Sequence, residues 1–108
     1  MGFFNSKLVA IPFKGEFREA MLSGRKTMTS RYKRYGEPGD YFKAFGKTFT
    51  IISVRKVQLS HVKDSFYYSE GFESPREFAK VWALLHPRRG FRPRDEVYLH
   101  SFRRGGPR

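Results

Sequence analysis

The chain of 108 residues contains no cysteine and only two side-chain amides, Asn5 and Gln58. Without cysteine it has neither a disulfide framework nor a thiolate for catalysis. Its apolar runs are far shorter than the roughly 20 residues that a membrane-spanning helix needs, and its first residues do not resemble a secretory signal. We therefore expect a cytoplasmic protein with no membrane partner. The scarcity of amides and cysteine is a trend of heat-adapted proteins and indicates a thermophilic source.

Acidic residues are also scarce, because 10 of them face 22 lysines and arginines, which gives a net charge of +12. Such an excess says little about fold but indicates an anionic partner. Tyrosine and phenylalanine lie among the cations, a combination typical of proteins that bind single-stranded nucleic acid. A solvated basic surface with a frayed tail is the alternative. The cations form an early group and a late group: Arg25, Lys26, Arg31, Lys33 and Arg34, then Arg88, Arg89, Arg92, Arg94, Arg103, Arg104 and Arg108.

The three histidines, His61, His86 and His100, lie far apart in the sequence and have no cysteine to complete a metal-ligand set. Their spacing does not predict a zinc site. The chain also lacks the glycine-rich loop that binds phosphates in nucleotide-binding enzymes. We therefore expect neither a metal nor a cofactor. His86 precedes Pro87 and is expected to cap the end of a helix.

Two helices are expected from apolar residues at helical spacing. The first covers residues 15–23. The second covers residues 75–85, where Ser74 is expected to cap the helix, with Pro75 at its first position and Glu77 placed for a capping box. One apolar stripe on the second helix contains its only tryptophan, which we therefore expect in the core: Phe78, Val81, Trp82 and Leu85.

Strands are expected over residues 8–12, 27–32, 41–45, 48–59 and 97–102. The fourth of these is irregular. Phe49 and Ile51 share one phase of the alternation, whereas Ile52 and Val54 share the other. A flat strand does not change faces in this way, but a bulged and strongly curved strand does. The pattern therefore favours a small barrel over an open sheet.

The most informative segment covers residues 24–31, where hydroxyl side chains alternate with cations directly after a glycine. Gly24 suits the end of a helix, because a left-handed backbone costs glycine nothing. One interpretation is a polar cleft lined by Lys26, Thr29 and Arg31. The other is an ordinary helix end, at which cations suit the helix dipole.

The arrangement G-x-K-x-x-x-x-R, formed by Gly24, Lys26 and Arg31, resembles the signature of the ASCH domain, a relative of the PUA-like RNA-binding fold. The turn at residues 38–40 and the Glu-Gly-Phe block at residues 70–72 follow in the family's order. The resemblance implies an α+β, mainly β fold, a PUA-like β-barrel of about five or six strands flanked by two or three helices. Residues 1–104 would form one domain, and residues 105–108 a disordered basic tail.

Some members of the family are amidohydrolases that remove acyl groups from the exocyclic nitrogen of cytidine with a lysine, a threonine and a glutamate. The resemblance assigns these roles to Lys26, Thr29 and Glu70. Thr29 would be the nucleophile, and Lys26 could accept its proton if desolvation lowered the pKa of the amine. Glu70 would orient the pair or shuttle a proton. Glu70 could equally be a structural carboxylate that pairs with Lys26 or Arg31 beneath a binding cleft.

We expect an RNA-binding domain with a basic cleft, acting as a monomer, with a nucleoside or nucleotide as a further candidate ligand. An N4-acylcytidine amidohydrolase is the first alternative. An interaction module of a larger ribonucleoprotein is the second. The residues expected to contact nucleic acid are Arg25, Lys26, Arg31, Lys33, Arg34, Arg88, Arg89 and Arg92.

Overall fold

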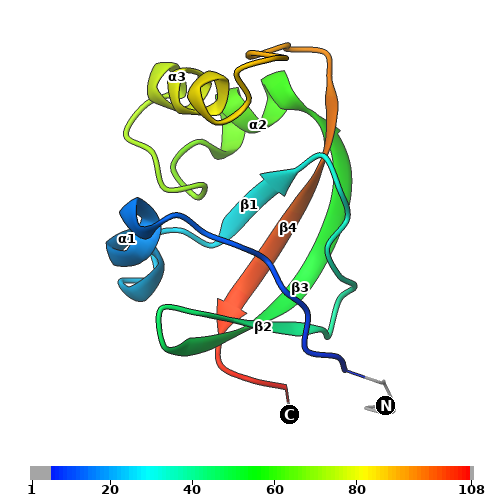
Figure 1. Ribbon diagram of the computed structural model, residues 1–108. Helices are drawn as coiled ribbons and strands as arrows, with labels where there is room; N and C mark the ends of the chain where they lie inside the picture. Colours follow the sequence, from blue (N-terminus) through cyan, green and yellow to red (C-terminus); the bar gives the residue numbers. More distant parts are fainter. Residues whose placement is uncertain (1–5, 108) are drawn as a thin grey trace.

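The structure, a computed structural model, describes residues 6–107 (Figure 1). Residues 6–107 form four strands, three α-helices and one short 3-10 helix, so that the fold is α+β and mainly strand, as predicted. None of the helices within residues 6–107 is long and apolar enough to cross a membrane. The elements are η1 (Gly15–Phe17), α1 (Arg18–Leu22), β1 (Met28–Arg31), β2 (Tyr41–Ala44), β3 (Lys47–Gln58), α2 (Leu59–Phe66), α3 (Pro75–Leu85) and β4 (Glu96–Arg104).

The four strands form one curled antiparallel sheet in the order β1-β4-β3-β2. Helices α2 and α3 lie at one end of this sheet, and the segment before α1 crosses it (Figure 1). The expected count of five or six strands is not confirmed within residues 6–107. The first expected strand, residues 8–12, contributes only one parallel bridge, between Leu8 and Tyr41.

The long strand β3 owes its curvature to a bulge. Ile51 pairs with Phe102 and Ser53 with Ser101, which leaves Ile52 without a partner in the ladder. Ile51 is buried, whereas 55% of Ile52 is exposed. The register shift between Ile51 and Ser53 confirms the bulge predicted from the change of phase in this strand.

Helix α2 was not predicted from the sequence. The chain turns directly from β3 into this helix at Leu59, which had been expected to end the strand. Only Leu59 and Val62 of the helix are buried. Its three apolar residues, Leu59, Val62 and Phe66, are at helical spacing, but the helix covers only eight residues and Leu59 also continues the apolar pattern of β3.

Two clusters of buried side chains stabilise the sheet. One lies between the sheet and the helices α2 and α3, and it includes Trp82, whose predicted burial is confirmed. The other is aromatic and lies beneath the segment that precedes α1, where the Phe42 ring stacks on Phe49 at 5.5 Å and meets Phe102 edge to face at 5.3 Å. Phe17 packs against both clusters. Phe17, which belongs to η1, therefore connects the two clusters.

Hydrogen bonds at the ends of α3 and β4 fix the boundaries of the sheet and its helix. Ser74 Oγ accepts the backbone N–H of Glu77 at 3.1 Å, which confirms the predicted cap. At the C-terminus, the Gly105 N–H donates to the Thr48 carbonyl at 2.8 Å, so that the chain follows the sheet past Arg104. Arg108, the last cation of the expected tail, lies outside the described residues.

Candidate functional site

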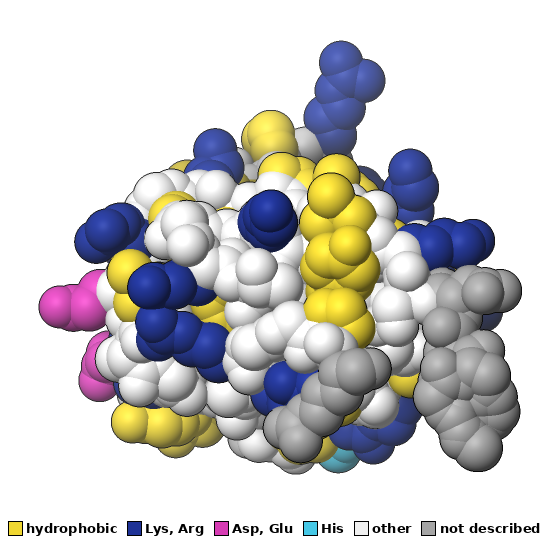
Figure 2. Space-filling model, turned by 90° about the horizontal axis from the view of Figure 1, so that it is seen from below, with side chains coloured by type: hydrophobic (Ala, Val, Ile, Leu, Met, Phe, Trp, Pro, Cys, Tyr) yellow, Lys and Arg dark blue, Asp and Glu magenta, His cyan; other side chains and the backbone are white. Residues whose placement is uncertain are grey.

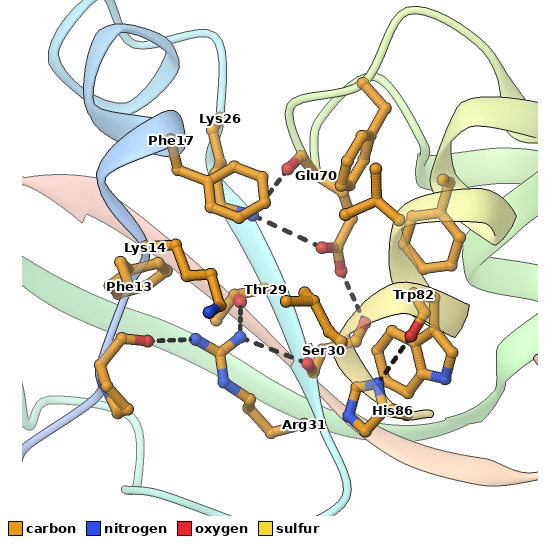
Figure 3. Close-up of a pocket in the computed structure, with 15 residues that line it drawn as sticks. Phe13, Lys14, Phe17, Lys26, Thr29, Ser30, Arg31, Glu70, Trp82 and His86 are labelled. Atoms are coloured by element: carbon orange, nitrogen blue, oxygen red, sulfur yellow. Dashed lines mark hydrogen bonds and ion pairs between the residues drawn. The ribbon is translucent and has the colours of Figure 1, made fainter. Parts of the chain in front are cut away.

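A pocket of about 420 Å³ lies along the outer edge of β1 (Figure 3). The segment before α1 forms one side of it, α3 forms the opposite side, and the loop after α2 contributes Glu70 and Phe72. The lining residues are Pro12, Phe13, Lys14, Phe17, Lys26, Thr29, Ser30, Arg31, Glu70, Phe72, Phe78, Val81, Trp82, Leu85 and His86. Its volume falls in the range of small-molecule sites.

A buried ion pair between Lys26 and Glu70 forms the polar wall. Only 3% of Lys26 and 4% of Glu70 is exposed. Lys26 Nζ donates to the Glu70 carbonyl at 2.6 Å, to the Met28 carbonyl at 2.8 Å and to Glu70 Oε1 at 3.5 Å. Glu70 Oε2 accepts the Ser30 hydroxyl at 2.6 Å. Every N–H of the ammonium group and both carboxylate oxygens therefore have a partner.

The environment of Lys26 disfavours its charged form. Burial lowers the pKa of Lys26 from 10.5 to about 8, although the neighbouring Glu70 carboxylate opposes this change. Nearby Arg31 adds a like charge that lowers the pKa further. The ammonium also lies 4.8 Å from the centre of the Phe17 ring, which offers it a cation–π contact.

Gly71 makes room for this lysine. A Cβ atom at Gly71 would lie 3.3 Å from Lys26 Cδ, and the glycine has a φ of +105°, which L side chains rarely adopt. The Glu70-Gly71 pair therefore supplies the carboxylate and, in the next residue, the gap through which the lysine reaches it. This gives a physical reason for two residues of the Glu-Gly-Phe block.

Arg31 lies beside the pair and is held by neutral oxygen atoms. Its guanidinium donates to the Thr29 hydroxyl, to the Ser30 carbonyl at 3.3 Å and to the Pro12 carbonyl at 2.5 Å. The same group lies 5.1 Å from the centre of the Phe13 ring. None of the ion pairs within residues 6–107 includes Arg31. Burial lowers the pKa of Arg31 from its ordinary value.

The opposite wall is apolar and aromatic. His86, at the end of α3, stacks on Trp82 with ring centres 4.2 Å apart, and its Nδ1 lies 3.0 Å from the Trp82 carbonyl. This is the helix-end contact expected for His86. Phe72 and Phe78 meet edge to face and continue the wall. The pocket therefore combines a charged side with a side suited to a flat apolar group.

The structure brings the four cleft residues predicted from the sequence into one site, because Lys26, Thr29, Arg31 and Glu70 all line the pocket. Within that site, the Thr29 hydroxyl is bound by Arg31 rather than by Lys26. Sequence reasoning did not include Ser30. The only sequence signal for Ser30 is its position in β1. Because side chains alternate along a strand, that position places Ser30 on the opposite face from Thr29.

The remaining predicted nucleic-acid contacts lie outside the pocket. Three of these arginines form ion pairs and also lie over tyrosine rings, whereas Lys33 lies over the Tyr35 ring and forms no ion pair within residues 6–107. Arg88 and Arg92 take part in no ion pair within residues 6–107. The three pairs are Arg25–Glu73 at 3.2 Å, Arg34–Glu37 at 2.5 Å and Arg89–Asp95 at 3.0 Å, over Tyr68, Tyr98 and Tyr32 respectively.

The cations are distributed over the surface instead of forming one continuous cleft. On the face shown in Figure 2, lysine and arginine side chains are scattered around the molecule, and acidic side chains lie at one margin. The face shown in Figure 2 therefore carries scattered positive charge and no continuous basic cleft. Such a surface attracts polyanions over a distance without selecting one.

Within residues 6–107, no three histidine, aspartate or glutamate side chains are grouped to hold a metal ion. His100 is fully buried, and both of its ring nitrogens lie near backbone groups: Nε2 accepts the Tyr35 N–H at 3.1 Å, and Nδ1 lies 3.1 Å from the Tyr98 carbonyl. Burial lowers the pKa of His100 from its ordinary value. The contacts of His100 therefore indicate a structural role.

Comparison with solved structures identifies the fold. No family sequence model matches the chain, and no curated protein matches it by sequence. The ASCH domain from Lactobacillus crispatus JV V101 superposes with a TM-score of 0.73 and 16% identity, over 94% of this chain and 80% of that one. A variant of the ASCH protein from Zymomonas mobilis superposes with a TM-score of 0.64 and 17% identity, over 93% of this chain and 71% of that one. A protein from Enterococcus faecalis V583 superposes with a TM-score of 0.67 and 18% identity, over 95% of this chain and 81% of that one.

These likenesses confirm that the chain has the fold of ASCH-domain structures, as the resemblance drawn from residues 24–31 and 70–72 implied. At 16–18% identity the similarity concerns the fold alone. The activity has to be argued from the site itself.

Proposed function

We propose that this protein binds RNA and holds one unpaired nucleotide in the pocket beside β1. The proposal rests on one observation: the pocket of about 420 Å³ has a charged wall on one side and an aromatic wall on the other. Bases taken out of a helix are recognised by stacking on aromatic side chains and by hydrogen bonds to their edges. His86, whose ring stacks on the buried Trp82, offers the first, and Thr29 and Arg31 offer the second.

The hydrogen bonds of the polar wall favour ligand binding over catalysis. The three N–H groups of the Lys26 ammonium are all donated to protein oxygens. A lysine that served as a general base for Thr29 would have to be neutral and within hydrogen-bond reach of its hydroxyl. In this geometry Arg31 holds that hydroxyl, and Lys26 with Glu70 forms a rigid support beneath the pocket.

Cations near the rim extend the surface for a strand that leaves the pocket. The Tyr32 ring lies 5.3 Å from His86, and the Arg89 guanidinium lies 4.7 Å above Tyr32. Arg88, Arg92 and Lys33, which form no ion pair in the described part of the chain, are the further candidates for phosphate contacts. Stacking and phosphate contacts of this kind give binding that tolerates many sequences.

Binding of short single-stranded RNA, followed through the emission of the sole tryptophan, tests the proposal. Because Trp82 lines the pocket, a base that enters should change its fluorescence. His86→Ala, at the rim of the aromatic wall, should weaken binding, whereas Lys47→Ala, on the β2–β3 hairpin, should alter it little. Absence of binding at low salt would contradict the proposal and favour a module that needs partner proteins.

One observation favours a second candidate, an N4-acylcytidine amidohydrolase. The pKa of Lys26, lowered by burial to about 8, would leave a fraction of the amine neutral near pH 7. Water would then cleave the amide of N4-acetylcytidine to give cytidine and acetate. Lys26→Ala and Thr29→Ala should abolish this turnover, and Lys33→Ala should preserve it. No hydrolysis at high protein concentration would leave binding as the function.

A further inference from the structure

The charges inside the pocket do not cancel. Lys26 and Glu70 neutralise one another at short range, and Ser30 occupies the second carboxylate oxygen. Glu70 is the only acidic residue among the lining side chains, which also include Lys14 and Arg31. The pocket therefore keeps an excess of positive charge after its own ion pair has formed.

Arg31 carries the part of that excess that lies deepest. A guanidinium has five N–H donors, and three protein oxygens accept from this one, those of Thr29, Ser30 and Pro12. Two donors of the guanidinium remain without a protein acceptor within residues 6–107. A largely buried cation is normally paired, because loss of its hydration is costly. Arg31 therefore has no carboxylate at ion-pair distance within residues 6–107, although Glu70 attracts it over a longer range, and part of its hydrogen-bonding capacity is unused.

Lys14 provides a second cation on the same side of the pocket. In Figure 3 its amine points toward the Arg31 guanidinium and the Thr29 hydroxyl. Lys14 is exposed and has no ion pair within the described part of the chain. Two like charges that face one region without a carboxylate between them repel one another, and an oxyanion placed between them removes that repulsion.

The remaining lining residues indicate which kind of chemical group carries the oxyanion. The wall opposite Arg31 offers side chains without a carboxylate or an aliphatic cation, and His86 and Trp82 are its members with a ring nitrogen. A small inorganic anion would leave this wall in contact with water. The apolar members are Phe72, Phe78, Val81, Trp82 and Leu85.

We propose that the pocket contains a phosphate subsite formed by Arg31 and Lys14, and that its ligand is a nucleotide with a terminal phosphate whose base lies against His86 and the neighbouring apolar side chains. This inference rests on the proposed function and adds the part of the nucleotide that is recognised. A phosphate monoester suits the site because it carries more charge than an internal phosphodiester. Its source is either a free nucleotide or the phosphorylated end of an RNA.

Calorimetric titration with the four common ribonucleosides and their 5′-monophosphates tests the subsite. The monophosphates should bind about tenfold or more tightly than the nucleosides, as expected for charge-assisted hydrogen bonds. Lys14→Gln should reduce this preference without affecting the fold, because Lys14 is exposed. Arg31→Gln should reduce it further. Lys47→Gln removes an equal charge at the far hairpin and should leave the preference unchanged.

Equal affinity for nucleosides and monophosphates would overturn the subsite, as would a preference that survives both pocket variants. A pair of RNA oligonucleotides that differ only in a 5′-phosphate separates this result from the proposed function. Binding of both with equal affinity, and no phosphate preference among mononucleotides, would refute the subsite and retain RNA binding. A phosphate preference among mononucleotides without any binding of RNA would support the subsite and refute RNA binding.

The same oligonucleotides identify the source of the phosphate. Tighter binding of the 5′-phosphorylated strand would support the subsite with an RNA end as ligand. Equal RNA binding, together with a phosphate preference among mononucleotides, would support it with a free nucleotide as ligand.

Discussion

At the scale of single residues, Lys26 should make the stability of the fold depend on pH. Its pKa is lowered by burial from 10.5 to about 8, so between these values the unfolded chain binds more protons than the folded one. The free energy of unfolding should therefore rise with pH through this window. Since a tenfold change in proton affinity is worth about 1.4 kcal/mol, Lys26 should contribute a rise of roughly 3 kcal/mol.

Denaturant unfolding of wild type and Lys26→Met at several pH values between 8 and 10.5 measures this contribution. The variant lacks the titrating amine, so its stability should change less with pH. Lys33→Met removes a lysine outside the pocket and should retain the wild-type dependence. Identical profiles for wild type and Lys26→Met would show that the amine titrates normally.

The cleft residues show what could be predicted from sequence at this scale. Glu70 and Lys26 are far apart in the chain, and only the motif resemblance placed them together. The contacts of Arg31 were not predictable, because they depend on the Pro12 carbonyl and Phe13, which reach the edge of β1 only in the folded chain. Sequence periodicity does not describe how an irregular segment crosses a strand.

At the scale of elements, α3 supports both the core and one wall of the pocket. Its Trp82 is 5% exposed, stacks on Phe78 with ring centres 5.9 Å apart and meets Tyr32 edge to face. Trp82→Ala should therefore reduce the free energy of unfolding by about 3–5 kcal/mol, the usual cost for a large core aromatic. Chemical denaturation followed by circular dichroism measures this loss.

The Ser74 cap provides a smaller reference on the same helix. Ser74→Ala removes the hydrogen bond to the Glu77 N–H and should cost about 1 kcal/mol. If Trp82→Ala cost no more than Ser74→Ala, the tryptophan would contribute little to the core and a role in binding alone would be favoured.

Elements with strong local signals could be predicted from the sequence, and those without them could not. Helix α3 has a capping residue, a proline at its first position and an apolar stripe, and β3 has a phase change that a bulge explains. Helix α2 buries only two side chains, and the first expected strand becomes a segment with a single bridge. Tertiary packing determines both of these segments, so local patterns miss them.

At the scale of the whole molecule, the net charge of +12 predicts RNA binding that depends strongly on salt. Each phosphate contact to a single strand contributes about −0.7 to the slope of log K against log salt concentration. Arg88→Ala should flatten the slope by about one such contact. Arg25→Ala should flatten it less, because Glu73 already pairs with Arg25.

Filter binding or anisotropy at several salt concentrations provides both slopes. Arg76→Ala, on the surface of α3 and outside the predicted contacts, serves as a control for the loss of one positive charge. Equal effects of all three substitutions would mean that only the overall charge matters and that no defined phosphate contacts exist.

The position of the pocket on the outer edge of β1 has a consequence for solubility. A strand at the edge of a sheet exposes carbonyl and N–H groups that can pair with a strand of another molecule. Here the side chains of Lys26 and Arg31 donate to the outward carbonyls of Met28 and Ser30. The pocket residues therefore also shield the sheet from intermolecular strand addition.

Loss of that shield should favour self-association. Arg31→Ala is expected to aggregate at lower protein concentration than Lys14→Ala, which leaves the edge of β1 covered. Static light scattering over a concentration series would show the difference, and equal scattering by the two variants would argue against it. Evolution of a new ligand preference in this pocket would then be restricted, because any residue that replaces Arg31 must also keep the edge of the sheet from pairing with its neighbours.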